Sequence, residues 1–423
     1  MRHFTQAPRH PGTQAPRHLG RIFSFLALAV TPPMCAAPML TTLATFNNTN
    51  GANPYAGLTS DAAGNLYGTT YQGGASNLGT VFKVAANTHV LTTLATFNNT
   101  NGASPYAGLV VDNVGNLFGA TYHGGSGGLG TIFQVSAGTR VLSTLVTFNG
   151  NNGALPLGGL FADGTGNLYG TTSGGGTLGI GTVFQLTAGT HALTTLVSLA
   201  SFTGPSGPSG RLTGDASGNL YGTSEGGGAG FPGAVFKVAG GTNTLTTLAT
   251  FNGTNGADPQ SSLIADAVGN LYGVAQLGGT GNFGTVFQVA VDTHAVTTLV
   301  TFNKANGATP IGGLIVDGAG NLYGTTNGGG ANGIGTVFKI AAGTNVLTTL
   351  MSFDATAGYA PDGDLIADAT GNLYGTTYLG GPSNQGTVFE LTGTGFVVPE
   401  PATFSLLAFT ALPLLRRRRR VAT

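Results

Sequence analysis

A unit of about 51 residues occurs seven times in this chain of 423 residues, and no other feature constrains the fold as strongly. Its first marker, Gly-Asn-Leu-Tyr/Phe-Gly, begins at Gly64, Gly115, Gly166, Gly218, Gly269, Gly320 and Gly371. A second marker, most often Gly-Thr-Val-Phe, begins fifteen residues after each of these, and a third, usually Leu-Thr-Thr-Leu, begins at Leu40, Leu91, Leu142, Leu193, Leu245, Val296 and Leu347. Such a period is typical of solenoids and propellers, in which each unit buries its faces against its neighbours.

Each unit predicts four short strands. In the second unit we expect them at residues 108–112, 116–122, 131–135 and 141–148, because these stretches are rich in Val, Thr, Leu and Phe. An Asp stands three residues before every first marker, and Asp-x-x-Gly is typical of a tight hairpin turn. Apart from the two ends of the chain, no stretch has a helical period with caps.

The order of the strands predicts a closed ring. The repeat region begins with a strand of the fourth type at residues 40–46 and ends with a strand of the third type at 387–391. Together these segments complete one four-stranded sheet, which is how a β-propeller joins its ends, whereas a solenoid has polar caps. We therefore predict an all-β, seven-bladed β-propeller over residues 38–396.

The N-terminal region, residues 1–37, has the order of a secretory signal peptide. Four Arg residues precede the apolar run 22–30, and small residues follow at 35–37. The run is too short to span a bilayer. Pro38 would hinder cleavage directly before it, so the cleavage position stays open.

The C-terminal region, residues 397–423, has three parts. Pro399, Glu400 and Pro401 precede a mostly apolar stretch at 402–415, and the basic residues Arg416, Arg417, Arg418, Arg419 and Arg420 follow it. A plain tail anchor would use the last two parts in the same way. The whole pattern resembles the PEP-CTERM sorting signal of Gram-negative bacteria. That resemblance implies transient membrane insertion, recognition by an exosortase-type sorting protease, and a final location at the cell surface, in the outer envelope or outside the cell.

The repeat region also resembles the GloVer tandem-repeat family over about 85% of the chain (residues 38–396 of 423). The residues that carry the resemblance form the string Phe…Gly…Pro…Leu…Asp-x-x-Gly-Asn-Leu-Tyr-Gly-Thr-Thr…Gly-Gly…Gly-Thr-Val-Phe, which in the first unit runs from Phe46 to Phe82. Members of that family commonly end in a surface-anchor signal. The resemblance implies no particular activity.

Charge and composition exclude several classes of function. Residues 39–396 contain 6 basic and 14 acidic residues, a formal charge of 6 − 14 = −8, which argues against binding nucleic acid or an anionic membrane surface. The single Cys excludes a disulfide framework and a Cys-based zinc site. The recurrent Asp residues predict turns rather than a calcium cluster, to which Asp362-Gly363-Asp364 is the nearest approach. No cofactor or metal site is predicted.

No catalytic set of residues can be identified in the sequence, so we expect a protein that is not an enzyme. No nucleophile stands beside a base, and no carboxylate pair for glycoside cleavage is visible. A secreted propeller enzyme that acts on polysaccharide, as a hydrolase or a lyase, stays open because propellers assemble sites from distant loops. A purely structural surface component is a third possibility.

The candidate binding residues lie on the long loops, which the alternation of short turns and long connections places at one face of the ring. They are Tyr55, Tyr71, Tyr106, Tyr122, His123, Tyr359 and Tyr378. Their Tyr residues belong to units one, two and seven, which are neighbours in a closed ring. We expect a binding patch for extracellular polysaccharide or surface proteins, with loop packing as the alternative role. Carboxylates that converge in the central funnel would favour the enzyme; a Tyr surface without them would favour the binder.

Overall fold

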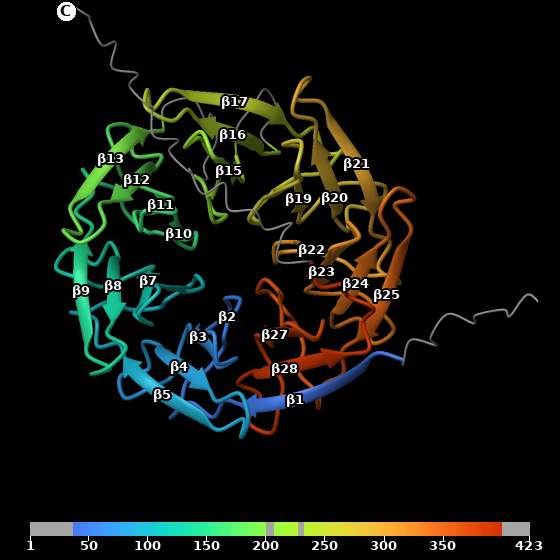
Figure 1. Ribbon diagram of the computed structural model, residues 1–423, viewed down its shortest axis with the longest axis horizontal. Coiled ribbons are helices and arrows are strands. Elements are labelled where there is room, and N and C mark those ends of the chain that lie inside the picture. Colours follow the sequence, from blue (N-terminus) through green and yellow to red (C-terminus); the bar gives the residue numbers. More distant parts are fainter. Residues whose placement is uncertain (1–36, 200–206, 227–231, 400–423) are drawn as a thin grey trace, which may run out of the picture. The chain divides into compact units, whose positions relative to one another are not determined.

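The computed structural model describes residues 37–199, 207–226 and 232–399, which belong to one compact unit and contain no helix. In this part of the chain, seven four-stranded antiparallel sheets surround a central axis as the blades of a β-propeller (Figure 1). Blades 1 to 6 are each built from four consecutive strands, and blade 7 combines β26, β27 and β28 with the N-terminal strand β1. The predicted seven-bladed propeller is confirmed. The predicted signal peptide and the sorting-signal residues from Glu400 onward lie outside the described residues.

Each blade has four strands in order from the axis outward. The inner strands are β2 (Thr59–Ser60), β6 (Val110–Val111), β10 (Phe161–Ala162), β14 (Thr213–Gly214), β18 (Ile264–Ala265), β22 (Ile315–Val316) and β26 (Ile366–Ala367). The second strands are β3 (Leu66–Thr70), β7 (Leu117–Thr121), β11 (Leu168–Thr172), β15 (Leu220–Ser224), β19 (Leu271–Ala275), β23 (Leu322–Thr326) and β27 (Leu373–Thr377). The third strands are β4 (Thr80–Val84), β8 (Thr131–Val135), β12 (Thr182–Leu186), β16 (Ala234–Val238), β20 (Thr285–Val289), β24 (Thr336–Ile340) and β28 (Thr387–Thr392). The outer strands are β5 (Leu91–Thr96), β9 (Leu142–Thr147), β13 (Leu193–Ser198), β17 (Leu245–Thr250), β21 (Val296–Thr301), β25 (Leu347–Ser352) and, for blade 7, β1 (Met39–Thr45).

The inner strands are shorter than the sequence predicts, two residues instead of about five. The residues before each inner strand run along the axis, where neighbouring backbones crowd one another. A Cβ atom on Gly57 would lie 2.8 Å from the backbone oxygen of Asp364 in the adjacent blade. Contacts between blades thus replace the strand ladder near the axis.

A Gly in the second strand of each blade faces a Phe in the third strand, which explains why both recur seven times. Gly68 pairs with Phe82, and a Cβ atom on Gly68 would lie 2.6 Å from the Phe82 ring. Any larger residue would therefore displace the ring. A Phe that covers a strand glycine in this way also fixes the register of the two strands.

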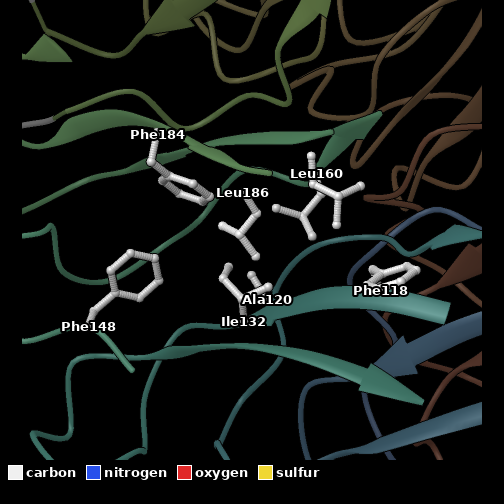
Figure 2. Close-up of a cluster of buried hydrophobic side chains, with 8 residues drawn as sticks. Phe118, Ala120, Ile132, Phe148, Leu160, Phe184 and Leu186 are labelled. Carbon is white, nitrogen blue, oxygen red and sulfur yellow. The ribbon is translucent and has the colours of Figure 1, made fainter. Parts of the chain in front are cut away.

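The hydrophobic core lies between blades. A Phe follows the outer strand of every blade except blade 3, where Leu199 takes its place, and it packs against the Phe of the next blade's third strand. Phe46 packs in this way against Phe82, with ring centroids 5.0 Å apart. Figure 2 shows the cluster between blades 2 and 3, where Phe148 and Phe184 pack with Ile132 and Leu186. Because every blade buries both faces in this way, the ring has no separate core that could form without its neighbours.

The recurrent Asp residues organise the turn between the first two strands, as predicted. Oδ1 of Asp163 accepts the backbone N–H groups of Thr165 and Asn167 at 2.9 and 3.0 Å, and Oδ2 accepts Asn167 Nδ2 at 2.8 Å and the hydroxyl of Tyr169 at 3.0 Å. Burial raises the pKa of Asp163, but these donated hydrogen bonds outweigh burial and hold the pKa below its ordinary value. The motif Tyr therefore binds the turn as well as packing.

Replacement of this Asp should destabilise a single blade measurably. We expect Asp163→Ala to lower the free energy of unfolding by about 2 kcal/mol, because it leaves charge-assisted donors without their acceptor. Tyr169→Phe should cost less, since Phe118 stands at the equivalent position of blade 2. Thermal melts of both variants check this, and equal losses would contradict the assigned role of the carboxylate.

The last described residues, 393–399, cross the face of the ring that carries the short turns, here called the short-turn face. The backbone N–H of Gly318 donates to Val397 O at 2.7 Å, and the ring of Phe396 packs on Tyr323 at 5.1 Å. Pro399, the first residue of the predicted sorting motif, reaches Gly318 at the turn of blade 6. The described residues include no helix long and apolar enough to cross a membrane.

Candidate functional site at the axial funnel

A cavity of about 160 Å³ lies on the axis, lined by residues from all seven blades; we call it the axial funnel. The lining comes mainly from the five residues Pro-x-x-x-Leu that lead into each inner strand: 54–58, 105–109, 156–160, 208–212, 259–263, 310–314 and 361–365. The Pro and Leu are constant in all seven units, and only the three residues between them vary. The Pro and Leu that position each segment are therefore the same in every blade, whereas the side chains that line the funnel differ from blade to blade.

The three variable residues define the composition of the funnel. The first is Tyr55, Tyr106, Leu157, Ser209, Gln260, Ile311 or Asp362, and the third is Gly57, Gly108, Gly159, Arg211, Ser262, Gly313 or Asp364, in blades 1 to 7. The second is always small. Glu225, which follows the second strand of blade 4, also lines the funnel. Three carboxylates thus converge on the axis.

Asp362 is the most buried of these carboxylates. It is only 5% exposed, and its Oδ1 accepts a hydrogen bond from Asn327 Nδ2 of blade 6 at 2.6 Å. Burial raises the pKa of Asp362 to about 7, against a smaller lowering by that hydrogen bond. A buried carboxylate that lines a cavity and titrates near neutrality is typical of a functional site.

Asp364 is held by the two blades that precede it. Its Oδ1 accepts the backbone N–H of Gly313 at 2.6 Å, and its Oδ2 accepts the hydroxyl of Ser262 at 3.2 Å. A Cβ atom on Gly313 would overlap the Ser262 hydroxyl, so a larger residue there would displace one of the two donors. The carboxylate is thus oriented by blades 5 and 6 although it belongs to blade 7.

Six of the seven predicted binding residues form one continuous group, here called the aromatic wall: Tyr55, Tyr71, Tyr106, Tyr122, His123 and Tyr378. Of these, Tyr55 and Tyr106 line the funnel. The rings of Tyr55 and Tyr106 are 4.0 Å apart, and Tyr378 approaches Tyr55 at 6.0 Å from blade 7. Tyr71 and Tyr122 flank Tyr106 at 5.9 and 6.2 Å, and His123 lies 4.4 Å from Tyr122. The wall spans blades 7, 1 and 2, in the order that ring closure predicts.

Tyr359 lies outside the aromatic wall. Its hydroxyl donates to Asn384 Oδ1 at 2.9 Å within the long loops of blade 7. Its backbone pairs with Leu379, as Ala52 and Ala103 pair with their loops in blades 1 and 2, so it does not occupy the position of Tyr55 or Tyr106.

The rings of the wall also pack against one another. Loop packing is the alternative role that the sequence allows for these residues. Burial raises the pKa of Tyr55, as do the nearby carboxylate of Asp362 and a hydrogen bond that the Tyr55 hydroxyl donates to Tyr106. Burial likewise raises the pKa of Tyr106 to about 12. The five Tyr residues of the wall are nevertheless all partly exposed and His123 is exposed, so the packed rings still form a surface.

Sequence reasoning missed the polar half of the funnel. It treated Asp362 and Asp364 only as a poor calcium motif, and it did not consider Glu225, Arg211 or Gln260. The repeat itself carries the missed signal. At the positions of Asp362 and Gln260 other units have Tyr, Leu, Ile or Ser, and at those of Asp364 and Arg211 they have Gly or Ser, between a constant Pro and a constant Leu. Within the described residues, no group of three or more His, Cys, Asp or Glu residues is placed to hold a metal ion.

Solved structures with the same fold share little sequence with this chain. The extracellular domain of a Bacteroides thetaiotaomicron protein described as a hybrid two-component system aligns with a TM-score of 0.55 at 13% identity, over 81% of this chain and 39% of that one. A puromycin-hydrolyzing peptidase of Mycobacterium tuberculosis aligns with a TM-score of 0.54 at 14% identity, over 82% and 52%. Oligogalacturonate lyase of Vibrio parahaemolyticus aligns with a TM-score of 0.52 at 11% identity, over 84% and 93%. This chain thus spans less than two thirds of the first two, and at these identities the likeness concerns the fold alone.

A search of the curated proteins finds no match to this chain. A family model does match, and its description is the Gloeobacter/Verrucomicrobia repeat. The matches cover residues 29–229, 115–320 and 208–406, which overlap and together span the whole propeller. The chain therefore belongs to the Gloeobacter/Verrucomicrobia repeat family, as its recurrent motifs indicate.

Proposed function

We propose that this chain is an exported surface protein whose axial funnel binds carbohydrate of the cell envelope or extracellular matrix. The observation that carries the proposal is the aromatic wall beside the funnel carboxylates. A sugar ring contacts proteins in two ways. Its apolar C–H face stacks on aromatic rings, and its hydroxyl groups donate hydrogen bonds to carboxylates and exchange hydrogen bonds with amides. The wall offers the first kind of contact, and Asp362, Asp364 and Gln260 offer the second.

The size of the funnel limits what enters it. Its volume of about 160 Å³ lies below the roughly 300–1,000 Å³ of sites that enclose a drug-sized ligand. One sugar residue or a chain end would occupy the funnel, and the rest of a polymer would lie across the aromatic wall.

The proposed location follows from the two ends of the chain. Residues 1–37 have the order of a secretory signal, and residues 397–423 resemble a PEP-CTERM sorting signal. The proposed processing partner is an exosortase-type protease that recognises Pro399, Glu400 and Pro401. Expression in a host with and without such a protease, followed by fractionation, would test this partner.

The carbohydrate proposal predicts that loss of the wall weakens binding. We expect the purified protein to bind glycans from a panel that includes polysaccharide of the producing cell, and Tyr106→Ala with Tyr122→Ala to weaken binding at least fivefold. Two lost stacking contacts account for about 1–3 kcal/mol. Tyr359→Ala is the matched control, because it removes a Tyr from the same face but not from the wall.

A folded protein that binds no glycan would contradict the proposal, and so would equal losses in the double variant and in the Tyr359→Ala control. Melting curves establish that each variant is folded. A structural or protein-binding role would then be the better account of this surface.

A polysaccharide-cleaving enzyme is the second candidate function, and the funnel carboxylates favour it. General acid–base chemistry needs a group whose pKa lies near the working pH, and Asp362 meets this requirement. The same incubations should therefore be examined by mass spectrometry for new reducing ends or unsaturated products. Products that disappear in Asp362→Asn would establish the enzyme, and intact glycan with retained binding would establish the binder.

A further inference from the structure

We propose that the funnel selects an ammonium group, so that its preferred ligand is a sugar residue with a free amino group. This inference rests on the proposed carbohydrate-binding function and adds the chemical class of the ligand. It is carried by the juxtaposition of buried carboxylate, aromatic faces and an uneven charge distribution around the axis.

The charges that line the funnel are mostly negative. Asp362, Asp364 and Glu225 contribute carboxylates, and among the described lining residues Arg211 is the only cation. Arg211 belongs to blade 4, three blades from Asp362 in the ring, and is exposed, with its stem against Gly159. The side of the funnel next to the aromatic wall is therefore an acidic one.

The hydrogen-bond partner of the buried Asp362 carboxylate is neutral, whereas a positively charged partner would stabilise the ionised carboxylate. It accepts one hydrogen bond, from the amide of Asn327. A buried charge without an opposite charge costs folding free energy. An ammonium group in the funnel would supply both the opposite charge and hydrogen-bond donors. A neutral sugar hydroxyl supplies a donor but no charge.

The aromatic wall favours the same ligand. The face of a Tyr ring attracts a cation within about 6 Å of its centroid, most strongly where water is excluded. The chain already uses this contact elsewhere, since Lys339 Nζ lies 5.3 Å from the centre of the Tyr323 ring. In the funnel, Tyr55 and Tyr106 lie beside Asp362 without a lysine in the lining.

Related sugars should be rejected for separate reasons. An N-acetyl group removes the positive charge and adds volume in a cavity of about 160 Å³. A uronic acid brings a carboxylate next to Asp362 and Asp364, where like charges repel. The funnel thus predicts an order of preference in which the free amine comes first and the uronic acid last.

The test compares four tetrasaccharides of matched length: glucosamine, N-acetylglucosamine, glucose and galacturonic acid oligomers. The chain contains 12 Tyr and no Trp, so its intrinsic fluorescence comes from tyrosine. A change on ligand addition that is lost in Tyr106→Ala with Tyr122→Ala would assign the signal to the aromatic wall. Titration calorimetry gives the affinities. We expect the glucosamine oligomer to bind at least tenfold more tightly than the N-acetylated one at pH 7.5, and Asp362→Asn to remove that preference while the exposed-site control Asp292→Asn retains it.

The outcomes separate this inference from the function on which it rests. Equal affinity for the glucosamine and glucose oligomers would overturn the ammonium inference and leave carbohydrate binding intact. Preference for the galacturonate oligomer would overturn it in favour of a site built on Arg211. Binding of methylammonium, lost in Asp362→Asn, with no binding of any oligomer would support an ammonium site and contradict carbohydrate binding. No binding of any of these probes would overturn both.

Discussion

Removal of residues 39–45 should open the ring and cost more stability than any single substitution. Strand β1 supplies the outer strand of blade 7 and pairs with β28 from Met39 opposite Thr392 to Thr45 opposite Thr387. Without it, the third strand of blade 7 becomes an exposed edge, and Phe46 no longer packs correctly against Phe82 in blade 1. We expect a fall in Tm of more than 15 °C, or aggregation during expression, because one unclosed blade exposes two core clusters.

The control removes only residues 1–38, which leaves the closing strand whole. That variant should melt within a few degrees of the processed protein. A propeller that keeps its Tm after loss of 39–45 would contradict closure by β1. A Cys pair placed at Thr41 and Glu390, which face each other across β1 and β28, provides an independent check, since a disulfide between them should raise the Tm.

Asp362→Asn should stabilise the protein at alkaline pH, which is unusual for the loss of a buried polar residue. The pKa of Asp362 is raised from 3.8 to about 7, so the folded state binds this proton more tightly than the unfolded state does. The stabilisation that follows from the raised pKa is full below pH 4 and is lost as the pH rises through about 7. Above pH 7 the ionised carboxylate costs on the order of 4 kcal/mol, and the variant avoids this cost.

The expected result is a difference in Tm between variant and wild type that is small at pH 4 and grows to roughly 5 °C at pH 8. Titratable neighbours of Asp362 are Tyr55, Tyr106 and Tyr378, which stay protonated in this range, and Asp364 on the same segment. Asp292→Asn makes the same chemical change in an exposed turn outside the funnel and is the matched control. A flat difference for Asp362→Asn would show that the carboxyl is not buried in the folded protein. Stability gained at the expense of ligand binding is a recurrent property of functional sites.

The fold could be predicted from the sequence because each blade is stabilised by the same set of contacts. The Gly68–Phe82 pairing, the Asp163 turn and the interblade Phe contacts recur, so their spacing in the sequence reports directly on the ring. Strand β1 could be assigned because the repeat starts and ends within a unit. The length of the inner strands could not be predicted, since it depends on crowding at the axis and not on the residues of the strand.

The candidate site could be predicted only in its aromatic half. Tyr residues stand out against the repeat, and ring closure places units 7, 1 and 2 together. Asp362 and Asn327 contact each other across blades although 35 residues separate them, and no local pattern records that contact. The polar residues of the funnel lie where one unit departs from the others between constant residues, as Asp362 and Arg211 do.

The position of the C-terminal segment determines how the funnel is presented. Met39 pairs with Thr392, and residues 393–399 cross the short turns of blades 6 and 7, so both ends of the propeller emerge at the short-turn face. The long loops and the aromatic wall lie at the opposite end of the axis. In the proposed form of the protein, held at the cell surface through the residues after Pro399, the proposed carbohydrate-binding surface would face away from the tether, with the full thickness of the ring between them.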